Sequence, residues 1–270
     1  MRHSVASVPF LNAKPLVWAI ENDDQFSIDV DYLWPSKLPA LLDSGRAEAV
    51  LVSSIDALTQ PGRAIAGGCS ISSRDRVMSV KVFSKTPLDR IKTLALDASS
   101  MTSNGLAQIV LGRMFGCRPE CRPLDPDGAA MLKENDACVL IGDKGLTFEG
   151  EGLYSLDLGE AWRNLTGLPF VWACWVGKFD LSPELVGQLV VARESGERNL
   201  AAVAAEAPDD IPPRLAHEYL TTVFDYSLGP DQLSALTLFG EWALEDGLFE
   251  RVYDIKVIEP AYPRLGASLV

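Results

Sequence analysis

The sequence predicts a two-lobed α/β protein whose last third is helical. Three observations predict it. Short β-type runs alternate with helical runs in the first half, a second unit of the same kind begins after Pro87, and three helical segments fill the last third. A βαβα rhythm is typical of α/β folds. Two such units in succession favour two lobes with a ligand cleft between them.

The first unit is defined by hydrophobic patterning and helix-start signals. Ile28–Leu33 alternates apolar and polar residues like a half-buried strand, whereas Ala49–Val52 is a continuous apolar run typical of a parallel strand covered on both faces. Ser36 is a suitable N-cap for a helix, and Gly45 is a suitable stop. The predicted strands are Ser4–Val8, Ile28–Leu33, Ala49–Val52 and Val77–Phe83. The predicted helices are Pro15–Glu21 and Lys37–Ser44.

Hydrophobic patterning and helix-start signals also define the second unit and the C-terminal tail. The segment Asn104–Met114 places its large apolar residues on one helical face, and Phe170–Val176 is the most apolar strand candidate. Ser182 before Pro183 is a typical helix start. The predicted strands are Thr93–Leu96, Ala137–Ile141, Leu153–Leu156 and Phe170–Val176. The predicted tail helices are Pro183–Ala205, Pro213–Phe224 and Asp231–Glu245.

The lobes are expected to be discontinuous in sequence. Residues 1–85 and 176–270, including the helical tail, are predicted to form the first lobe, and residues 86–175 the second. The chain would cross between them near Ser84–Pro87 and return near Cys174–Lys178. Two crossings allow the lobes to close on a ligand by hinging there.

Charge and hydropathy exclude several classes of protein. Lys and Arg number 24 against 37 Asp and Glu, a formal net charge of −13, which argues against nonspecific nucleic-acid binding and anionic membrane surfaces. A small anionic substrate remains compatible, because a few N–H and O–H groups can hold a carboxylate locally. No uninterrupted apolar run reaches membrane-spanning length and the N-terminus carries no signal-peptide pattern, so a cytoplasmic protein is expected.

The absence of several motifs argues against nucleotide binding, metal binding and Ser-His-Asp hydrolysis. No phosphate-binding loop and no dinucleotide fingerprint occur, and five cysteines without a C-x-x-C pair form no zinc pattern. The two histidines, His3 and His217, lie outside the predicted loops at the strand ends. We therefore expect neither a metal site nor a cofactor, and no Ser-His-Asp hydrolase.

Polar loops at the ends of predicted strands are the candidate site. Ligands bind at the carboxyl edge of open α/β sheets. Pro9–Asn12 follows the first strand, Ser53-Ser54 the third, Asp97–Ser103 the Thr93–Leu96 strand, and Gly142-Asp143 the Ala137–Ile141 strand. Hydroxyls and N–H groups just before a helix suit a carboxylate. The alternative is that these serines and threonines only cap helices.

Several of these segments resemble one family. Val8–Leu16 resembles the N-terminal signature of chorismate dehydratases from the futalosine route to menaquinone, an aromatic-Leu-Asn followed by Pro-Leu. Further matches occur in the expected order, and the resemblance spans roughly residues 4–178. These matches are Ala49–Ile55, Val77–Val80, Asp97–Ser103, Ala137–Asp143, Asp157–Trp162 and Gly167–Val171.

The resemblance implies a fold and a reaction. The fold is that of type II periplasmic binding proteins, adapted to catalysis in the cytosol. The reaction is a hydro-lyase reaction in which chorismate loses its 4-hydroxyl as water and becomes 3-[(1-carboxyvinyl)oxy]benzoate, without a cofactor. The partner is then a small anionic substrate. The protein must hold two carboxylates, position the C3 proton and help hydroxide depart.

Two other interpretations stay open. The 1,4-dihydroxy-6-naphthoate synthase of the same pathway shares this fold, but it typically has a Ser-Pro-Cys-Pro-Asn-Asp-Thr-like start and a histidine base. This chain has Phe10-Leu11-Asn12 there and no histidine between His3 and His217. A noncatalytic small-anion-binding protein would also have this fold, since function resides in the site.

The candidate residues follow from these loops and the resemblance. Asn12 is expected to assist departure of the 4-hydroxyl, because a neutral amide both donates and accepts. The α-helix start at Ser100, Met101, Thr102 and Ser103 is expected to hold one carboxylate, with Ser54 and Ser79 lining the opposite lobe.

The base is expected to be the substrate itself. The enolpyruvyl carboxylate, folded back, would approach the C3 proton at high effective molarity. Asp143 is the alternative base, although an Ile-Gly-Asp turn can equally use its carboxylate to accept from backbone N–H groups.

Overall fold

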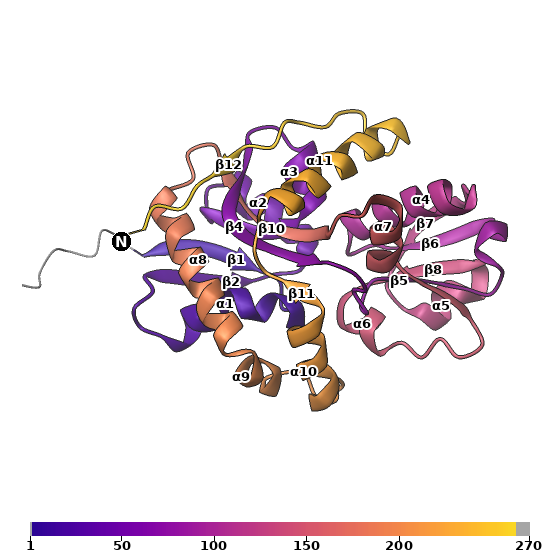
Figure 1. The fold of residues 1–270 in the computed structure, drawn as a ribbon, viewed down its shortest axis with the longest axis horizontal. Helices are drawn as coiled ribbons and strands as arrows, with labels where there is room; N and C mark the ends of the chain where they lie inside the picture. The colour runs from indigo at the N-terminus through magenta and orange to yellow at the C-terminus, as the bar shows by residue number, and fades with distance from the viewer. Residues whose placement is uncertain (1, 263–270) are drawn as a thin grey trace, which may run out of the picture.

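The computed structural model describes residues 2–262 and shows two sheets side by side (Figure 1). The first sheet runs β11-β4-β10-β3-β1-β2, with β12 on β4, and the second runs β7-β6-β8-β5-β9. The first contains β1 (His3–Ser7), β2 (Ile28–Tyr32), β3 (Ala49–Ser53), β4 (Arg63–Ser73), β10 (Phe170–Lys178), β11 (Phe224–Asp225) and β12 (Val257–Ile258). The second contains β5 (Lys81–Ser84), β6 (Thr93–Asp97), β7 (Glu120–Leu124), β8 (Ala137–Leu140) and β9 (Tyr154–Asp157). The predicted two-lobed α/β fold is confirmed.

Eleven α-helices cover the sheets within the described residues. They are α1 (Lys14–Asn22), α2 (Leu38–Asp43), α3 (Ser54–Thr59), α4 (Met101–Phe115), α5 (Gly128–Glu134), α6 (Gly142–Thr147), α7 (Leu158–Thr166), α8 (Pro183–Arg198), α9 (Leu200–Ala205), α10 (Pro213–Thr222) and α11 (Pro230–Glu245). Short 3-10 turns are η1 (Leu11–Ala13), η2 (Pro35–Lys37) and η3 (Leu88–Arg90). None of the helices in residues 2–262 is long and apolar enough to cross a membrane.

Parallel pairing puts the strand ends where a site can form. β1 pairs in parallel with β2 and β3, and β6 pairs in parallel with β7 and β8. A helix or a 3-10 turn follows each of β1, β3, β6 and β8 directly or after a short loop. The loops predicted as candidate site therefore lie at the carboxyl edges of two sheets.

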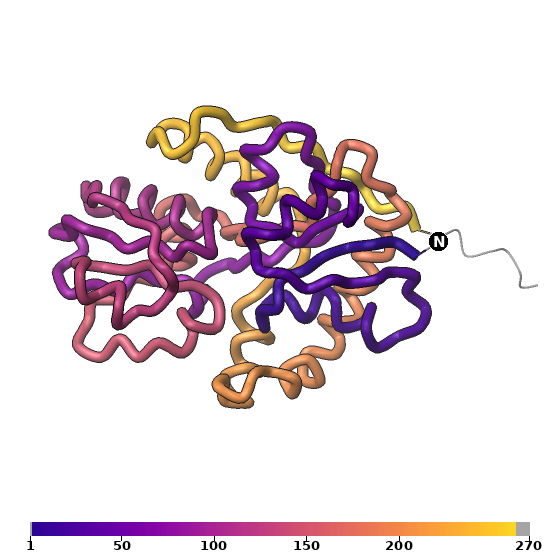
Figure 2. Tube along the Cα trace, turned by 180° about the vertical axis from the view of Figure 1, so that it is seen from behind, coloured from indigo at the N-terminus to yellow at the C-terminus, as the bar shows by residue number. Residues whose placement is uncertain are grey.

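The tail helices pack mainly on the first lobe. Figures 1 and 2 show the C-terminal third, in orange and yellow, running along that lobe, with α11 reaching toward the second. α8 lies against α1 so closely that a Cβ at Gly196 would be 1.8 Å from the Pro15 carbonyl oxygen. Trp162 of α7 packs against Phe239 and Trp242 of α11, which ties α7 to the tail.

The lobe boundaries differ from the expected ones. β5 belongs to the second sheet although residues up to 85 were assigned to the first lobe, and β10 pairs with β3 and β4 along its whole length. The crossings are therefore residues 74–80 and the α7 segment 158–169, not Ser84–Pro87 and Cys174–Lys178. Residue 1 and residues 263–270 of the predicted first lobe lie outside the described residues.

The two crossings meet at one carboxylate. Asp157 accepts hydrogen bonds from the backbone N–H groups of Val77 at 3.0 Å and Met78 at 2.8 Å, and it also caps α7. Met78 has a left-handed φ of 63°, unusual for a non-glycine residue. These contacts explain why the predicted strand Val77–Phe83 begins only at Lys81.

One predicted helix is divided in the structure, and several observed elements were not predicted. The helix predicted over Pro183–Ala205 divides at Asn199, whose φ and ψ of −116° and 23° leave the helical region. β4, β7, α5, α6 and α7 were not predicted. β4 is buried along its length and shows no alternation, and its two central glycines weaken the strand signal.

Candidate functional site

The loops after β1, β3, β6 and β8 converge on a cleft between the lobes. Its inner chamber has a volume of about 80 Å³ and opens into an outer chamber of about 650 Å³. Phe10, Pro35, Ser99 and Ile141 line both chambers, so the two are continuous. Residues of all four predicted loops therefore line this cleft.

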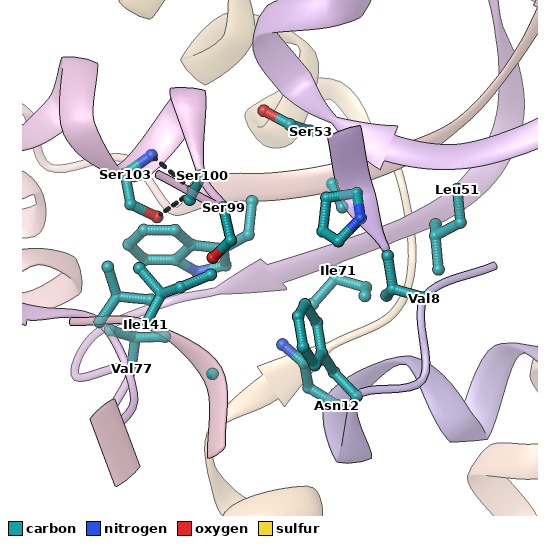
Figure 3. A pocket seen from close by; sticks show the side chains of 16 residues that line it. Val8, Asn12, Leu51, Ser53, Ile71, Val77, Ser99, Ser100, Ser103 and Ile141 are labelled. Atoms are coloured by element: carbon teal, nitrogen blue, oxygen red, sulfur yellow. Dashed lines mark hydrogen bonds between the residues drawn. The ribbon is translucent and has the colours of Figure 1, made fainter. Parts of the chain in front are cut away.

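The inner chamber has apolar walls and uncharged polar groups (Figure 3). Asn12, Ser53, Ser99, Ser100 and Ser103 supply the polar side chains. The apolar lining includes Val8, Phe10, Leu51, Ile71, Val77, Val80, Ile141 and Trp172. No acidic, basic or histidine side chain lies among these described lining residues.

Trp172 contributes a flat apolar wall. It is nearly buried, its indole N–H donates to Ser73 Oγ at 3.0 Å, and its ring contacts Phe170 with centroids 4.5 Å apart. These contacts fix the indole plane, and an aromatic plane of this kind suits a six-membered ring by stacking. Sequence reasoning missed Trp172 because it lies within a strand, not in a strand-end loop.

Asn12 lines the inner chamber with a side-chain oxygen that has no hydrogen-bond partner among the described residues. It lies in the 3-10 turn η1, just after β1, and Figure 3 shows its side chain among the chamber residues. Its Oδ1 is buried without a hydrogen-bond partner within the described residues. A buried unpaired amide oxygen is costly, so a ligand that pairs with this amide gains binding energy. The amide can both donate and accept.

Ser100 and Ser103 face Asn12 from the other lobe. Ser100 is the N-cap of α4, its Oγ accepting from the Ser103 N–H at 3.2 Å and donating to Ser103 Oγ at 2.9 Å (Figure 3). Because Ser103 Oγ accepts this bond, its own proton can point to a ligand. The helix is 15 residues long, so its N-terminus carries a partial positive charge.

The other predicted serines and threonine have protein partners. Thr102 Oγ1 contacts Ser53 Oγ and accepts from the Ile55 N–H at 3.1 Å, which bridges the lobes. Ser54 donates to the Val171 carbonyl at 2.5 Å, and Ser79 accepts from Tyr219. None of these three lines either chamber.

Met101, also predicted, is 57% exposed and lies outside both chambers. Ser53 and Ser99 line the inner chamber and were not among the predicted residues. Each is the sequence neighbour of a predicted serine, so the loops were identified but not the orientation of every side chain.

Two of the four aspartates that line the outer chamber, Asp97 and Asp143, have raised pKa values. Burial raises the pKa of Asp143, and the negative charge of Asp210 raises it further, while a hydrogen bond from the Leu11 backbone N–H opposes the shift. Burial also raises the pKa of Asp97, which accepts from Ser99 N–H at 2.9 Å and Ser99 Oγ at 2.5 Å. Both acids carry one buried oxygen without a partner in the described part of the chain.

No metal cluster accompanies these acids. Within residues 2–262, His, Cys, Asp and Glu side chains nowhere gather in threes in a way that could hold an ion. All five cysteines, which lie between residues 69 and 174, are unpaired thiols.

Sequence comparisons identify relatives. A family model described as menaquinone biosynthesis matches residues 3–245. A chorismate dehydratase of Thermus thermophilus is 32% identical over 231 residues, covering 77% of this chain and 83% of the relative. A chorismate dehydratase of Campylobacter jejuni is 31% identical over 140 residues, covering 52% of this chain and 49% of the relative.

Solved structures agree on the fold. A structural-genomics protein of Archaeoglobus fulgidus matches with a TM-score of 0.67 and 19% identity, covering 92% of this chain and 98% of its own. A Candida albicans protein described as having the generic periplasmic binding protein fold has a TM-score of 0.63 and 12% identity, with 99% of both chains covered. The periplasmic aliphatic sulphonate binding protein of Escherichia coli has a TM-score of 0.60 and 12% identity, covering 100% of this chain and 98% of its own. The chain therefore has the periplasmic-binding-protein fold.

Proposed function

Because this chain belongs to the menaquinone-biosynthesis family and is a relative of chorismate dehydratases, we propose that it is itself a chorismate dehydratase. The reaction removes the C4 hydroxyl and the C3 proton of chorismate as one water. The ring becomes aromatic and the product is 3-[(1-carboxyvinyl)oxy]benzoate. One observation carries the proposal beyond family membership: Asn12, Ser100 and Ser103 meet in an uncharged chamber beside the Trp172 indole.

Each group has a task in this reaction. At the start of α4, the Ser103 hydroxyl donates to one substrate carboxylate, Ser100 orients that hydroxyl, and the helix dipole attracts the negative charge. The Trp172 indole lies against the ring. The Asn12 amide donates to the departing 4-hydroxyl, stabilising negative charge where it develops. The chamber walls hold these groups in place before reaction.

The base in this mechanism is the enolpyruvyl carboxylate of the substrate. The absence of acidic, basic and histidine side chains among the described residues of the inner chamber supports it, since no protein group there is a suitable acceptor at neutral pH. Asp143 borders only the outer chamber. A carboxylate carried on the same molecule can reach the C3 proton at high effective molarity.

The pathway and the cellular compartment of the reaction are part of the same proposal. We assign it to the futalosine route of menaquinone synthesis in the cytoplasm. The family description supports the menaquinone part. Five unpaired cysteines support a reducing compartment, because thiols persist there.

The test is direct conversion of the substrate. Purified protein is incubated with chorismate, and the mixture is separated by chromatography with detection of a product lighter by one water and aromatic in its ultraviolet spectrum. The expected result is time-dependent formation of that product, lost in Asn12→Ala and kept in Asn164→Ala, a variant of an exposed asparagine on α7. Chorismate binding without product formation would instead identify a noncatalytic binding protein.

A further inference from the structure

The outer chamber has one positive side chain among five charged ones. Asp97, Asp125, Asp143 and Asp210 are acidic, and Lys144 is the single base among the described residues that line it. The chain as a whole has a formal net charge of −13. A dianion entering the cleft therefore meets like charge, and Lys144 is the lining group that attracts it.

The position of Lys144 suits a ligand contact. It lies in α6, and its Nζ donates to the Pro126 carbonyl at 2.8 Å, across the chamber wall. An ammonium has three N–H donors, so this bond fixes the head group and uses one of them. Although four aspartates share the chamber, Lys144 forms no ion pair within residues 2–262.

The inner chamber leaves one carboxylate of a dicarboxylate without a cationic partner. Ser100 and Ser103 can bind one carboxylate, and no cation lies among the described residues of that chamber. The outer chamber continues from it past Phe10 and Ser99. A ligand with two carboxylates can therefore place the first at α4 and extend the second toward Lys144.

We infer that Lys144 binds the ring carboxylate of the substrate, while the enolpyruvyl carboxylate stays at α4 as the base, and that Lys144 makes the cleft selective for dicarboxylates over monocarboxylates. The inference rests on the proposed function, because chorismate is a dicarboxylate. A charge-assisted hydrogen bond at this place adds binding energy in both the ground state and the transition state, so it acts on KM more than on kcat.

Kinetics separate this role from a structural one. Lys144→Gln keeps an N–H donor for the Pro126 carbonyl but loses the charge, and Lys144→Arg keeps the charge. The matched control is Lys92→Gln, an exposed lysine just before β6 and therefore at the edge opposite the cleft. The glutamine variant is expected to raise KM for chorismate about tenfold, with kcat changed less than about twofold.

Two further results belong to the same kinetic experiment. The arginine variant and the control are expected to stay near wild type. Added salt screens the attraction of Lys144 for the ligand, so kcat/KM of wild type is expected to fall relative to that of Lys144→Gln as salt rises. An unchanged KM in Lys144→Gln, or an equal loss in Lys92→Gln, would overturn the inference.

Binding tests the inference without catalysis. Calorimetry compares 3-(carboxymethoxy)benzoate, a dicarboxylate, with the monocarboxylates 3-methoxybenzoate and phenoxyacetate. Lys144→Gln is expected to weaken the dicarboxylate about tenfold and phenoxyacetate, which lacks the ring carboxylate, less than about twofold. Equal weakening of all three ligands would overturn it, as would no measurable binding of the dicarboxylate to wild type. Lysine-dependent dicarboxylate binding by a protein that leaves chorismate unchanged would refute the proposed function but support the inference.

Discussion

Tyr219 donates its hydroxyl to Ser79 Oγ at 2.7 Å, and both side chains are buried. The contact joins α10 of the tail to residues 74–80, which carry the chain from the first sheet to the second. Ser79 was expected to line the substrate site. In the structure its hydroxyl stabilises the crossing instead, beside the Asp157 contacts to Val77 and Met78.

The Tyr219–Ser79 bond is expected to contribute to stability as a pair. Tyr219→Phe and Ser79→Ala should each lower the free energy of unfolding by about 1–2 kcal/mol, and the double variant should lose little more than either, because the Tyr219–Ser79 bond is lost in all three cases. Denaturant unfolding measures this. Fully additive losses would show that the two hydroxyls act independently.

Asn12 is expected to act on turnover and not on stability. Asn12→Ala should lower kcat by at least about a hundredfold, since removing one donor at a developing negative charge has that effect in other enzymes. Its melting temperature should change little, because Oδ1 has no partner to lose among the described residues. Steady-state kinetics and thermal unfolding, with Asn164→Ala as control, check both parts. Turnover near that of the control would contradict the role.

The sequence predicted which loops surround the cleft better than which side chains line it. The parallel-sheet rule placed four loops at one edge, and they do converge. Ser53 lines the chamber whereas Ser54 donates to Val171, because neighbouring residues at a strand-to-helix junction point in different directions. Met101 likewise occupies the first turn of α4 but points outward.

The lobe boundaries depended on information that local patterns do not contain. Hydrophobic alternation identifies a strand but not the sheet that it joins. β5 pairs with β8 and β9, and β10 with β3 and β4, so sheet membership is decided by residues distant in sequence. The overall α/β class followed from local periodicity alone.

The serines are expected to separate into binding and structural groups. Ser103→Ala should lower kcat/KM by the equivalent of roughly 1–3 kcal/mol, the cost of a lost hydrogen bond to a charged ligand. Ser100→Ala should also lower kcat/KM, because Ser100 orients the Ser103 hydroxyl. Ser54→Ala removes a buried bond to the Val171 carbonyl, so it should lower the free energy of unfolding and leave KM for chorismate unchanged. Kinetics and unfolding are measured on all three. The site lies elsewhere if no serine variant alters kcat/KM.

Asp143 is expected to destabilise the protein increasingly as pH rises. Burial and Asp210 raise its folded-state pKa, so the folded chain binds this proton more tightly than the unfolded chain. Stability is therefore lost as pH rises from the unfolded pKa through the folded one. Asp143→Asn should gain free energy of unfolding relative to wild type as pH rises above about 4, whereas the exposed control Asp24→Asn should not. A difference independent of pH would contradict this.

The origin of the base is tested by changing the substrate rather than the protein. A chorismate analogue whose enolpyruvyl carboxylate is replaced by a neutral amide keeps the ring, the 4-hydroxyl and the C3 proton. If the substrate supplies the base, the analogue should bind but fail to become aromatic, because the inner chamber offers no titratable side chain among its described lining residues. Competition against chorismate measures binding, and product formation measures turnover. Turnover at the rate of chorismate would assign the base to the protein. Asp143 would then be the first residue to replace. It accepts a hydrogen bond from the backbone N–H of Leu11, the residue before Asn12, and its raised pKa makes it a stronger base than an ordinary aspartate.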